Sequence, residues 1–595
     1  MKRLLITASS KTLIISFLLI SCLLSTSVYA ADILPPDKLI IGVKSDSDYK
    51  TYYIRTDGGT FAQCTGLSSS AYPGSGTGLN CALNHPFELF PPGGAARISG
   101  GDTVIVGVGS YRMGHTIGLY DSGDCQSDWG YDCTASQIPS GIDAENPTRI
   151  LGAGWDTQLG DKPELYGVER ARQVLKIGDS DFVEIQWLEL TDHEDCTYNS
   201  TGEAVSSRCN RSTYPRGDHA DTGITAGNSS HDVLLKNLNI HGFTIAGIKA
   251  AGLTDWTIEN VRLANNSFVG WDGDYGDTPS NSGDLIFRNV EISFNGCSET
   301  YPGGEPHNCY SQSQGGYGDG LGTALTDGNW LFENVDFSHN VSDGLDLLYH
   351  SGNGTITIKN SRFEANAGNQ LKVATDSHIE NSIIVGNCEY FETTNPGLTI
   401  DSSIGFTSCR ANGDTIAYII NNVGQDITLV NNTILSRSTV MILAKGSVCN
   451  GTENFISRNN IFYGDRSYLK SLDVGIVRPT MFYNGGSDGN GAGPCGPAAT
   501  DTAIEIDNKY SISYQTKNGD EDCRDPSALC DNPRFSALKF SDTGYWDLSL
   551  STESPAVGKS GLTVEDRVFG SVVAPSTDYN GISRTSSTDW GALKH

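Results

Sequence analysis

Residues 328–337 read GNWLFENVDF, and residues 354–363 repeat the same pattern as GTITIKNSRF. Each stretch carries apolar residues in alternate positions, reaches an asparagine, and continues through two variable positions to another apolar residue. The unit recurs between about residues 230 and 465, and its asparagines are Asn237, Asn260, Asn289, Asn334, Asn360, Asn381, Asn431 and Asn459. The apolar residues three positions later are Ile240, Leu263, Ile292, Phe337, Phe363, Ile384, Ile434 and Phe462. A unit that recurs in this way is typical of a solenoid, in which each repeat forms one coil.

The spacing of the asparagines indicates the type of solenoid. The separations are 23 residues from Asn237 to Asn260, 29 from Asn260 to Asn289, 26 from Asn334 to Asn360 and 21 from Asn360 to Asn381. Short strands suit coils stacked about 4.8 Å apart, in which each asparagine bonds its neighbours at a turn. Helical periodicity is absent from this part of the sequence. We therefore predict an all-β fold, a right-handed, single-stranded parallel β-helix (solenoid).

The sequence divides into four expected segments. Residues 1–30 have the form of a secretory signal peptide cleaved after Ala30, because Lys2 and Arg3 precede an apolar run and small residues precede the cleavage point. Cys22 lies in a lipoprotein-like box, so lipid anchoring at that residue is the alternative to free secretion. Residues 31–99 are expected to form an N-terminal segment and cap, residues 100–545 the parallel β-helix, and residues 546–595 a C-terminal closing segment.

Composition narrows the function classes. The formal charge of −30 argues against nucleic acid as a partner, and it means that an acidic polysaccharide would need a local cation or a bound metal. Of the 15 cysteines, 14 remain when Cys22 is set aside, and several lie close together in sequence, as in Cys125 and Cys133 or Cys297 and Cys309. This usage favours disulfides in an exported chain. No segment after the signal peptide is apolar enough to span a membrane, and we expect a monomer.

When the coils are aligned on their asparagines, residues at the same distance in sequence after the asparagine fall into one column, because stacked coils repeat in space. Asp319-Gly320-Leu321 matches Asp343-Gly344-Leu345, so Asp319 is expected one coil before Asp343. Asp319, Asp343 and Asp346 would then repel one another unless a cation lay between them, and oxygen-only ligands favour Ca²⁺. The alternative is that these aspartates are turn residues of a solenoid. The column twelve residues after the asparagine contains Lys249, Asp272, Asp346 and Lys372, and the column nine residues after it contains Asp343 and Asn369.

Lys372 is the candidate general base, since it lies one coil beyond Asp346 in the same column. A bound dication disfavours the charged form of a neighbouring lysine, which suits removal of a proton from a substrate. The alternative role of Lys372 is a salt bridge to Asp346. Lys249, on the other side of the acidic coils, and Asn369 are candidate substrate-binding residues.

Ser342-Asp343-Gly344-Leu345-Asp346, followed one coil later by Gly368-Asn369-Gln370-Leu371-Lys372, resembles the calcium and lysine motifs of family 9 polysaccharide lyases. The resemblance implies that Asp319, Asp343 and Asp346 bind Ca²⁺. It also implies that Lys372 removes the C5 proton of a galacturonate, leaving a C4–C5 double bond. The chain departs from the family pattern at Ser342, where an aspartate is usual, and at Gln370, where a glycine is usual.

The sequence therefore predicts a secreted polysaccharide lyase that cleaves a uronate-containing, pectate-like polymer by calcium-assisted β-elimination. Two other functions are compatible with a β-helix. A glycoside hydrolase would use carboxylates such as Asp272, Asp319, Asp343 and Asp346 as acid and base. A non-catalytic adhesin or carbohydrate-binding solenoid would need no reaction at all, because a fold does not imply an activity.

Overall fold

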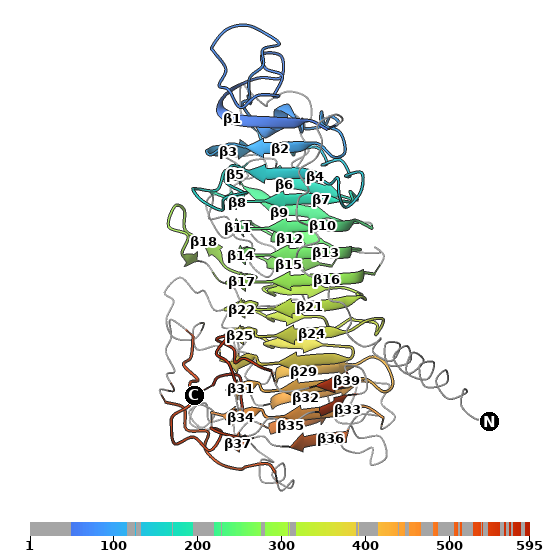
Figure 1. Ribbon diagram of the computed structural model, residues 1–595, viewed down its shortest axis with the longest axis vertical. Helices are drawn as coiled ribbons and strands as arrows, with labels where there is room; N and C mark the ends of the chain where they lie inside the picture. The colour runs from blue at the N-terminus through green and yellow to red at the C-terminus, as the bar shows by residue number, and fades with distance from the viewer. Residues whose placement is uncertain are drawn as a thin grey trace, which may run out of the picture. The chain divides into compact units, whose positions relative to one another are not determined.

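The computed structural model describes residues 49–594 apart from internal segments, of which the longer ones are 116–124, 126–132, 194–218, 310–316, 392–413, 466–479, 486–504 and 515–526, with shorter gaps elsewhere. The proposed signal peptide and Cys22 lie outside the described residues. Within them the chain forms three long parallel sheets whose strands lie one above another in chain order (Figure 1). This confirms the predicted parallel β-helix.

Sheet A has 13 described strands, and all its pairings are parallel. In order they are β1 (Thr51–Gly59), β2 (Thr103–Val106), β4 (Thr148–Gly152), β7 (Val183–Gln186), β10 (His231–Lys236), β13 (Thr254–Glu259), β16 (Ser282–Arg288), β21 (Asn329–Glu333), β24 (Ile356–Lys359), β27 (Ser377–Glu380), β30 (Asp426–Val430), β33 (Asn454–Arg458) and β36 (Glu505–Lys509).

Sheet B has 12 described strands, each following a strand of sheet A in the chain. They are β3 (Ser110–Met113), β5 (Glu164–Gly167), β8 (Glu189–Asp192), β11 (Asn239–His241), β14 (Arg262–Ala264), β17 (Glu291–Ser293), β22 (Asp336–Ser338), β25 (Arg362–Glu364), β28 (Ile383–Gly386), β31 (Thr433–Ser436), β34 (Ile461–Gly464) and β37 (Ile512–Tyr514).

Sheet C has 10 described strands and supplies the third strand of ten coils. They are β6 (Ala171–Gly178), β9 (Ala220–Ala226), β12 (Ala246–Ala250), β15 (Val269–Gly273), β20 (Leu321–Thr323), β23 (Leu345–Asp346), β26 (Leu371–Val373), β29 (Asp414–Ile420), β32 (Val440–Gly446) and β35 (Thr480–Gly485). Outside the three sheets lie a 3-10 turn, η2 (Pro86–Glu88), and two antiparallel hairpins, β18 (Ser298–Glu299) with β19 (Pro306–His307) and β38 (Val564–Asp566) with β39 (Gly570–Val572).

The repeated asparagine forms the turn between sheets A and B. All eight predicted asparagines have a positive φ, between 50° and 57°, which asparagine tolerates better than most residues. Their side chains bond along the stack, as in the 3.0 Å bond from Asn260 Nδ2 to Asn237 Oδ1 and the 2.9 Å bond from Asn289 to Asn260. Each asparagine therefore adopts the positive φ of the turn with little strain, and in these pairs its side-chain oxygen accepts a hydrogen bond from the amide of the next asparagine. This bonding between neighbouring coils was predicted from the spacing.

A second, buried asparagine ladder forms the turn between sheets B and C. Asn266, Asn295, Asn340 and Asn366 are linked in this order by side-chain bonds of 3.0, 2.9 and 2.8 Å. The ladder ends on Gln370, whose Oε1 accepts from the Asn366 side chain at 3.0 Å and from the Asn366 backbone at 3.1 Å. Gln370 is thus a structural cap, which explains this departure from the lyase family pattern.

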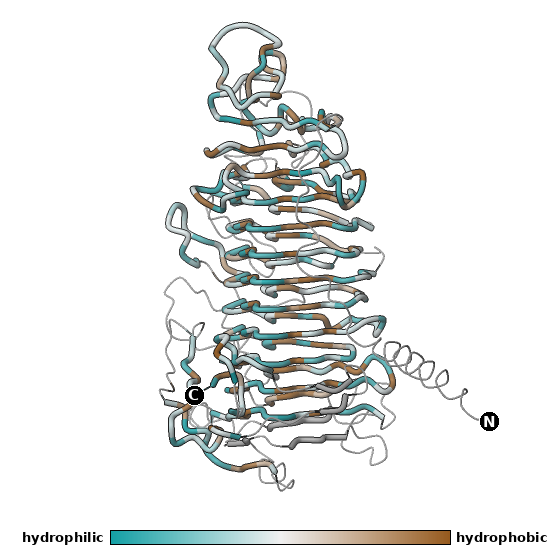
Figure 2. The backbone as a smooth tube through the Cα atoms, in the orientation of Figure 1, coloured by the Kyte–Doolittle hydropathy of each residue, from teal (hydrophilic) through white to brown (hydrophobic). Residues whose placement is uncertain are grey.

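The interior between the sheets is apolar and largely aromatic. Buried apolar residues alternate along strands such as β2 and β21, and brown segments recur from coil to coil in the coloured part of the chain (Figure 2). Phe287 stacks on Phe332 with ring centroids 5.1 Å apart, and Phe337 stacks on Phe363 at 5.2 Å. Columns of stacked rings bury large areas and hold successive coils in register.

Both ends of the chain add to the solenoid. Strand β1 pairs with β2, so the segment expected to precede the helix supplies the first strand of sheet A. At the other end, Trp546, Leu548 and Leu593 pack against Ile383 and Val385 of sheet B. The described part of the closing segment therefore covers the side of the late coils (Figure 1).

Disulfides close short loops. Cys125 bonds to Cys133 and Cys297 bonds to Cys309, as their proximity in sequence suggested, and Cys64 bonds to Cys81. Cys196, Cys209 and Cys523 lie outside the described residues. In the described part of the chain no helix is both long and apolar enough to cross a membrane.

Candidate functional site

The predicted column of charged residues runs up the outer face of sheet C. Lys249 pairs in register with Asp272, and Asp272 with Gly322. Gly322 pairs with Asp346, and Asp346 with Lys372. The offset from the turn asparagine therefore located Lys249, Asp272, Asp346 and Lys372 correctly, while Gly322, which lies between Asp272 and Asp346 in the column, was not predicted.

Three aspartates meet on two adjacent coils of this face. Asp319 lies just before β20, Asp343 just before β23, and Asp346 is the last residue of β23. Each offers an oxygen within 4.8 Å of the others, and Asp319 and Asp343 are buried. The predicted convergence of these three carboxylates is confirmed, while their role as metal ligands stays a prediction.

Backbone amides hold each carboxylate by one oxygen. Oδ1 of Asp319 accepts from the Asp343 amide at 3.0 Å, Oδ1 of Asp343 from the Asn369 amide at 2.6 Å, and Oδ1 of Asp346 from the Leu348 amide at 3.0 Å. Asp319 also accepts a bond from the Ser342 side chain. Ser342, the other departure from the family pattern, is therefore a buried hydroxyl donor to a proposed ligand.

The cluster has the dimensions of a calcium site. Ca²⁺ binds carboxylate oxygens at about 2.3–2.6 Å, so two of its ligands lie at most about 5 Å apart. The 4.8 Å limit on the aspartate oxygens meets this requirement. Gly368 allows the close approach, because a Cβ there would lie 2.2 Å from Asp343 Oδ1. The donor set, made of hard oxygen atoms only, also suits Ca²⁺.

Burial makes this concentration of negative charge costly. Burial, followed by the charges of Asp343 and Asp346, raises the pKa of Asp319 to about 7. Burial also raises the pKa of Asp346, although Lys372 opposes that rise. Carboxylates whose pKa rises in this way are ones that a bound cation would stabilise in their ionised form.

Lys372 reaches the cluster from β26, in the next coil. Its Nζ lies 2.5 Å from Asp343 Oδ2 and 2.7 Å from Asp346 Oδ2, and its side chain is 14% exposed. The ammonium thus contacts the oxygens that the backbone amides leave available. The ion pair between Lys372 and Asp346, which was expected as the alternative role of this lysine, is present in the structure. A base beside a metal would act from the same position.

The two candidate substrate-binding residues have different surroundings. Lys249 Nζ lies 2.5 Å from Asp272 Oδ2, and its side chain is 35% exposed on the outer face of sheet C. Asn369 is buried, and its backbone amide holds Asp343. A substrate-binding role for either residue stays a prediction, but the described role of Asn369 is to position a carboxylate.

Sequence reasoning overlooked Asp274. Burial, together with the charges of Asp272 and Asp346, raises the pKa of Asp274, so its carboxylate lies near the cluster. The signal was present in Asp272-Gly273-Asp274, because residues two apart on a strand share a face. Asp274 thus joins Asp272, Asp319, Asp343 and Asp346 as a fifth carboxylate on the acidic face.

Comparison with known proteins agrees with the fold. Residues 222–405 match the family described as "Right handed beta helix region", which agrees with the predicted handedness. The chain is similar to the crystal structure of pectate lyase Pel9A (14% identity, 94% of this chain and 98% of that chain covered, TM-score 0.42). It is also similar to the A-module of the Azotobacter vinelandii mannuronan C-5 epimerase AlgE6 (12%, 61% and 85%, 0.34) and to a rhamnogalacturonan lyase (13%, 59% and 84%, 0.29). No curated protein matches the chain in sequence.

Proposed function

We propose that this chain is a polysaccharide lyase that cleaves a uronate-containing, pectate-like polymer by calcium-assisted β-elimination. The observation that carries the proposal is the contact of Lys372 with the buried cluster of Asp319, Asp343 and Asp346. A site for this reaction needs a place for a cation and a base beside it. The three aspartates and Lys372, which lie together on one face of sheet C, could fill these two roles.

The proposed roles follow from the positions of the side chains. Asp319, Asp343 and Asp346 would hold the calcium ion, each with one oxygen anchored by a backbone amide. Bound calcium would neutralise the substrate carboxylate and so acidify the neighbouring C5 proton. Lys372, as the neutral amine, would accept that proton at Nζ. A cation on Asp343 and Asp346 would compete with the ammonium for the same oxygens, which favours the neutral form of Lys372.

The geometry favours this reaction over hydrolysis. Glycoside hydrolases keep their two carboxyl groups about 5–9.5 Å apart, on opposite sides of the scissile bond. Asp319, Asp343 and Asp346 instead offer oxygens within 4.8 Å of one another. Carboxylates this close suit a shared cation better than an acid and a base that flank a sugar bond.

The proposal includes the setting in which the enzyme acts. Disulfides such as Cys64–Cys81 and Cys297–Cys309 are compatible with an oxidising compartment. We therefore propose that the chain is secreted and works as a monomer on an acidic polysaccharide.

The decisive experiment follows unsaturated product by ultraviolet absorbance on a panel of uronate polymers, with calcium and with a chelator. We expect elimination to require calcium and to fall by about 10² to 10⁴ in Lys372→Ala, the usual contribution of a general base. Lys249→Ala is the matched control, because Lys249 shares the column and also contacts an aspartate.

Each outcome separates the candidate functions. New reducing ends without unsaturated product would indicate a hydrolase, and neither product on any polymer would indicate a binding protein. If Lys249→Ala abolishes elimination and Lys372→Ala leaves it intact, the assignment of the base is wrong.

A further inference from the structure

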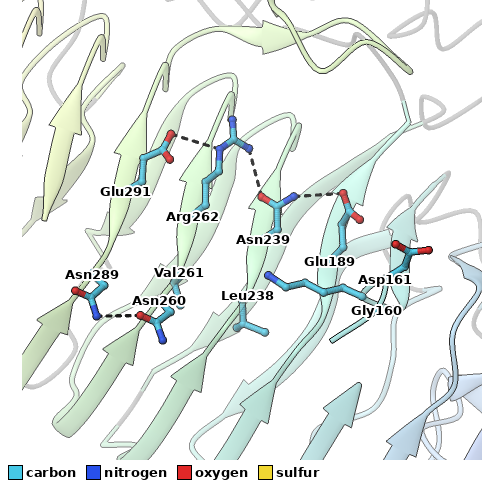
Figure 3. A pocket seen from close by; sticks show the side chains of 11 residues that line it. Gly160, Asp161, Glu189, Leu238, Asn239, Asn260, Val261, Arg262, Asn289 and Glu291 are labelled. Carbon is cyan, nitrogen blue, oxygen red and sulfur yellow. Dashed lines mark hydrogen bonds and ion pairs between the residues drawn. The ribbon is translucent and has the colours of Figure 1, made fainter. Parts of the chain in front are cut away.

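A second polar site lies on a different sheet from the aspartate cluster. A groove of about 860 Å³ follows the coils of β8, β11, β14 and β17 on sheet B (Figure 3). Glu189, Asn239, Arg262 and Glu291 occupy one register position on successive coils and line the groove. Three coil steps of about 4.8 Å give this row a length of about 14 Å, parallel to the stacking direction. A groove of this shape suits a linear ligand.

The polar groups of the row are only loosely bonded to one another. Asn239 Nδ2 donates to Glu189 Oε1 at 3.3 Å, Arg262 Nη1 donates to Asn239 Oδ1 at 3.3 Å, and Arg262 Nε lies 3.4 Å from Glu291 Oε1 (Figure 3). Well-formed bonds of these types are about 2.9 Å long. The side chains of Arg262 and Glu291 are 36% and 43% exposed. Glu291 Oε1 also accepts from the Ser293 hydroxyl at 2.6 Å, so the bonding capacity that a ligand can use lies mainly on Asn239 and Arg262 and on the second oxygen of each glutamate.

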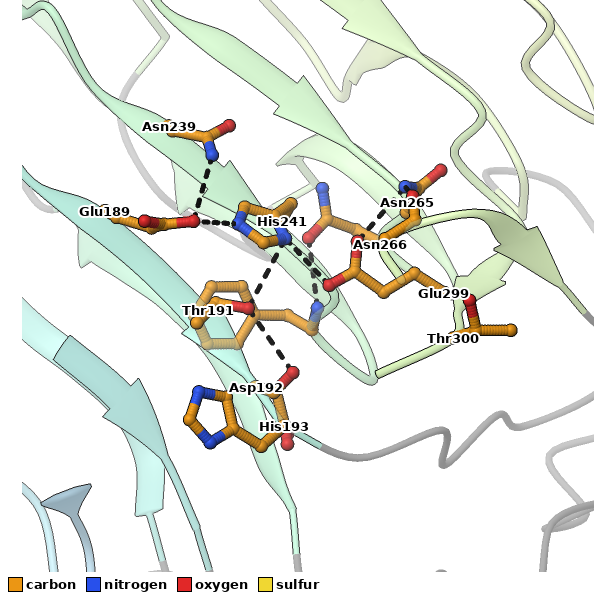
Figure 4. A network of polar contacts seen from close by, with 12 residues as sticks. Glu189, Thr191, Asp192, His193, Asn239, His241, Asn265, Asn266, Glu299 and Thr300 are labelled. Atoms are coloured by element: carbon orange, nitrogen blue, oxygen red, sulfur yellow. Dashed lines mark hydrogen bonds and ion pairs between the residues drawn. The ribbon is translucent and has the colours of Figure 1, made fainter. Parts of the chain in front are cut away.

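Glu189, at one end of the row, is held by contacts with a neighbouring histidine. His241 lies 2.9 Å from Glu189 Oε1 and 2.7 Å from Glu299 Oε1 in the neighbouring hairpin (Figure 4). Burial alone would lower the pKa of His241, but the bonds to these two carboxylates outweigh it and raise the pKa to about 9. The imidazolium fixes the orientation of Glu189 at the groove, which reduces the entropy lost when a ligand binds.

The charges of the groove select the class of ligand. Its lining contains three carboxylates, on Asp161, Glu189 and Glu291, against two cations, on Lys162 and Arg262. The lining is close to neutral, with one more carboxylate than cations, so it offers a polyuronate no net attraction. Carboxylate, amide and guanidinium groups in one row offer acceptors and donors side by side, which is the arrangement that neighbouring sugar hydroxyls require.

We propose that the groove on sheet B binds a neutral, hydroxyl-rich oligosaccharide chain, laid along the row from Glu189 to Glu291. It is an accessory binding site, and it does not depend on the lyase activity proposed for sheet C. A chain with both sites would hold a neutral glycan on one face and act on an acidic polymer on the other.

Calorimetric titration of the full chain tests this proposal. Lys372→Ala serves as the parent, so that no substrate is consumed. The probes are linear galacto-, arabino-, xylo- and gluco-oligosaccharides, with oligogalacturonate for comparison. We expect at least one neutral probe to bind, and Glu291→Ala and Asn239→Ala each to weaken its affinity by about tenfold, as expected for a lost bond to a ligand hydroxyl.

Glu333→Ala is the matched control. Glu333 also pairs with an arginine of the preceding coil, Arg288 at 3.0 Å, and is 41% exposed, but it lies on sheet A, outside the groove. Its loss should leave the affinity unchanged. Failure of every neutral probe to bind would overturn the proposal. Unchanged affinity in both groove variants would also overturn it, as would a groove variant that weakens oligogalacturonate alone.

Discussion

Sheets B and C each carry a column of charged residues on the same coils. On sheet B the charges largely neutralise one another, whereas on sheet C carboxylates cluster together. On sheet B, most charged residues have an opposite charge beside them, as in Arg262 beside Glu291 and Asp336 beside Arg362, although Glu291 and Asp336 are neighbours of like charge. On sheet C, Asp319, Asp343 and Asp346 meet from adjacent coils, and Asp319 and Asp343 are buried. Like charges stacked about 4.8 Å apart repel strongly in a buried setting. The sheet B column is therefore nearly self-neutralising, whereas the sheet C cluster needs a cation, which is Lys372 in the structure and calcium in the proposed reaction.

Solvent exposure widens the contrast within sheet B itself. In the early coils Glu291 is 43% exposed, but in the late coils the closing segment covers the column. The Tyr545 ring lies over the Arg362 guanidinium at 4.4 Å, and Arg362 donates to the Trp546 carbonyl at 2.9 Å. The same column is thus an open binding surface in one half and an internal interface in the other.

The largest difference between the two columns should appear in calcium-dependent stability when one carboxylate is removed from each sheet. Calcium at about 100 times its Kd should stabilise the parent by about 2.7 kcal/mol, because only the native state binds it. We expect Asp343→Ala to lose this gain and Glu291→Ala to keep it. Melting curves recorded with calcium and with a chelator measure both effects. An undiminished calcium response in Asp343→Ala would show that the ion binds elsewhere.

The pH dependence of stability should identify the buried cluster. Burial raises the pKa of Asp319 to about 7 in the folded chain, whereas an unfolded aspartate has a pKa of about 4. The folded state therefore holds an extra proton between these values, and the stability this proton contributes is lost as the pH rises through 7.

In chelator, the melting temperature of the parent should fall more steeply between pH 4 and pH 7 than that of Asp319→Asn. The pKa of Glu364 is likewise raised to about 7 by burial, but Glu364 is present in both proteins, so its contribution cancels in the comparison. Parallel curves for the two proteins would contradict the assignment of the extra proton to Asp319.

The smallest effect should come from making sheet B resemble sheet C. Arg262→Glu places a carboxylate beside Glu291, and exposed like charges at this spacing should cost roughly 0.5 kcal/mol. The variant should gain no new calcium response, because these exposed carboxylates lack the backbone amides that hold the aspartates of sheet C. Denaturant unfolding with and without calcium measures both quantities. A large calcium response in this variant would mean that proximity of carboxylates alone makes the site.

Much of the fold could be predicted because the repeat depends on local features of the sequence. An asparagine at a positive φ defines the turn, with 21 to 29 residues between most neighbours and 45 or 50 across two longer coils, and the alternation of apolar residues defines the inner face of each strand. Once the coils are in register, equal offsets become neighbours, which is why Asp346 and Lys372 could be paired from sequence. Arg262, Glu291, Asp336 and Arg362 also share one offset, two residues after a turn asparagine, and this pattern by itself predicts an exposed charge ladder. The prediction is wrong for Arg362, since that residue is buried.

The sequence by itself determined the coil, its register and the residues that share a column, because these depend on backbone geometry that repeats from one coil to the next. Only the tertiary structure decided which columns are buried and which polar groups partner one another. Gln370 as the cap of an inner ladder, Ser342 as a donor to Asp319, and His241 between two glutamates each depend on contacts across coils and insertions. Such contacts depend on distance and burial in three dimensions, and neither is encoded in the spacing of the repeat.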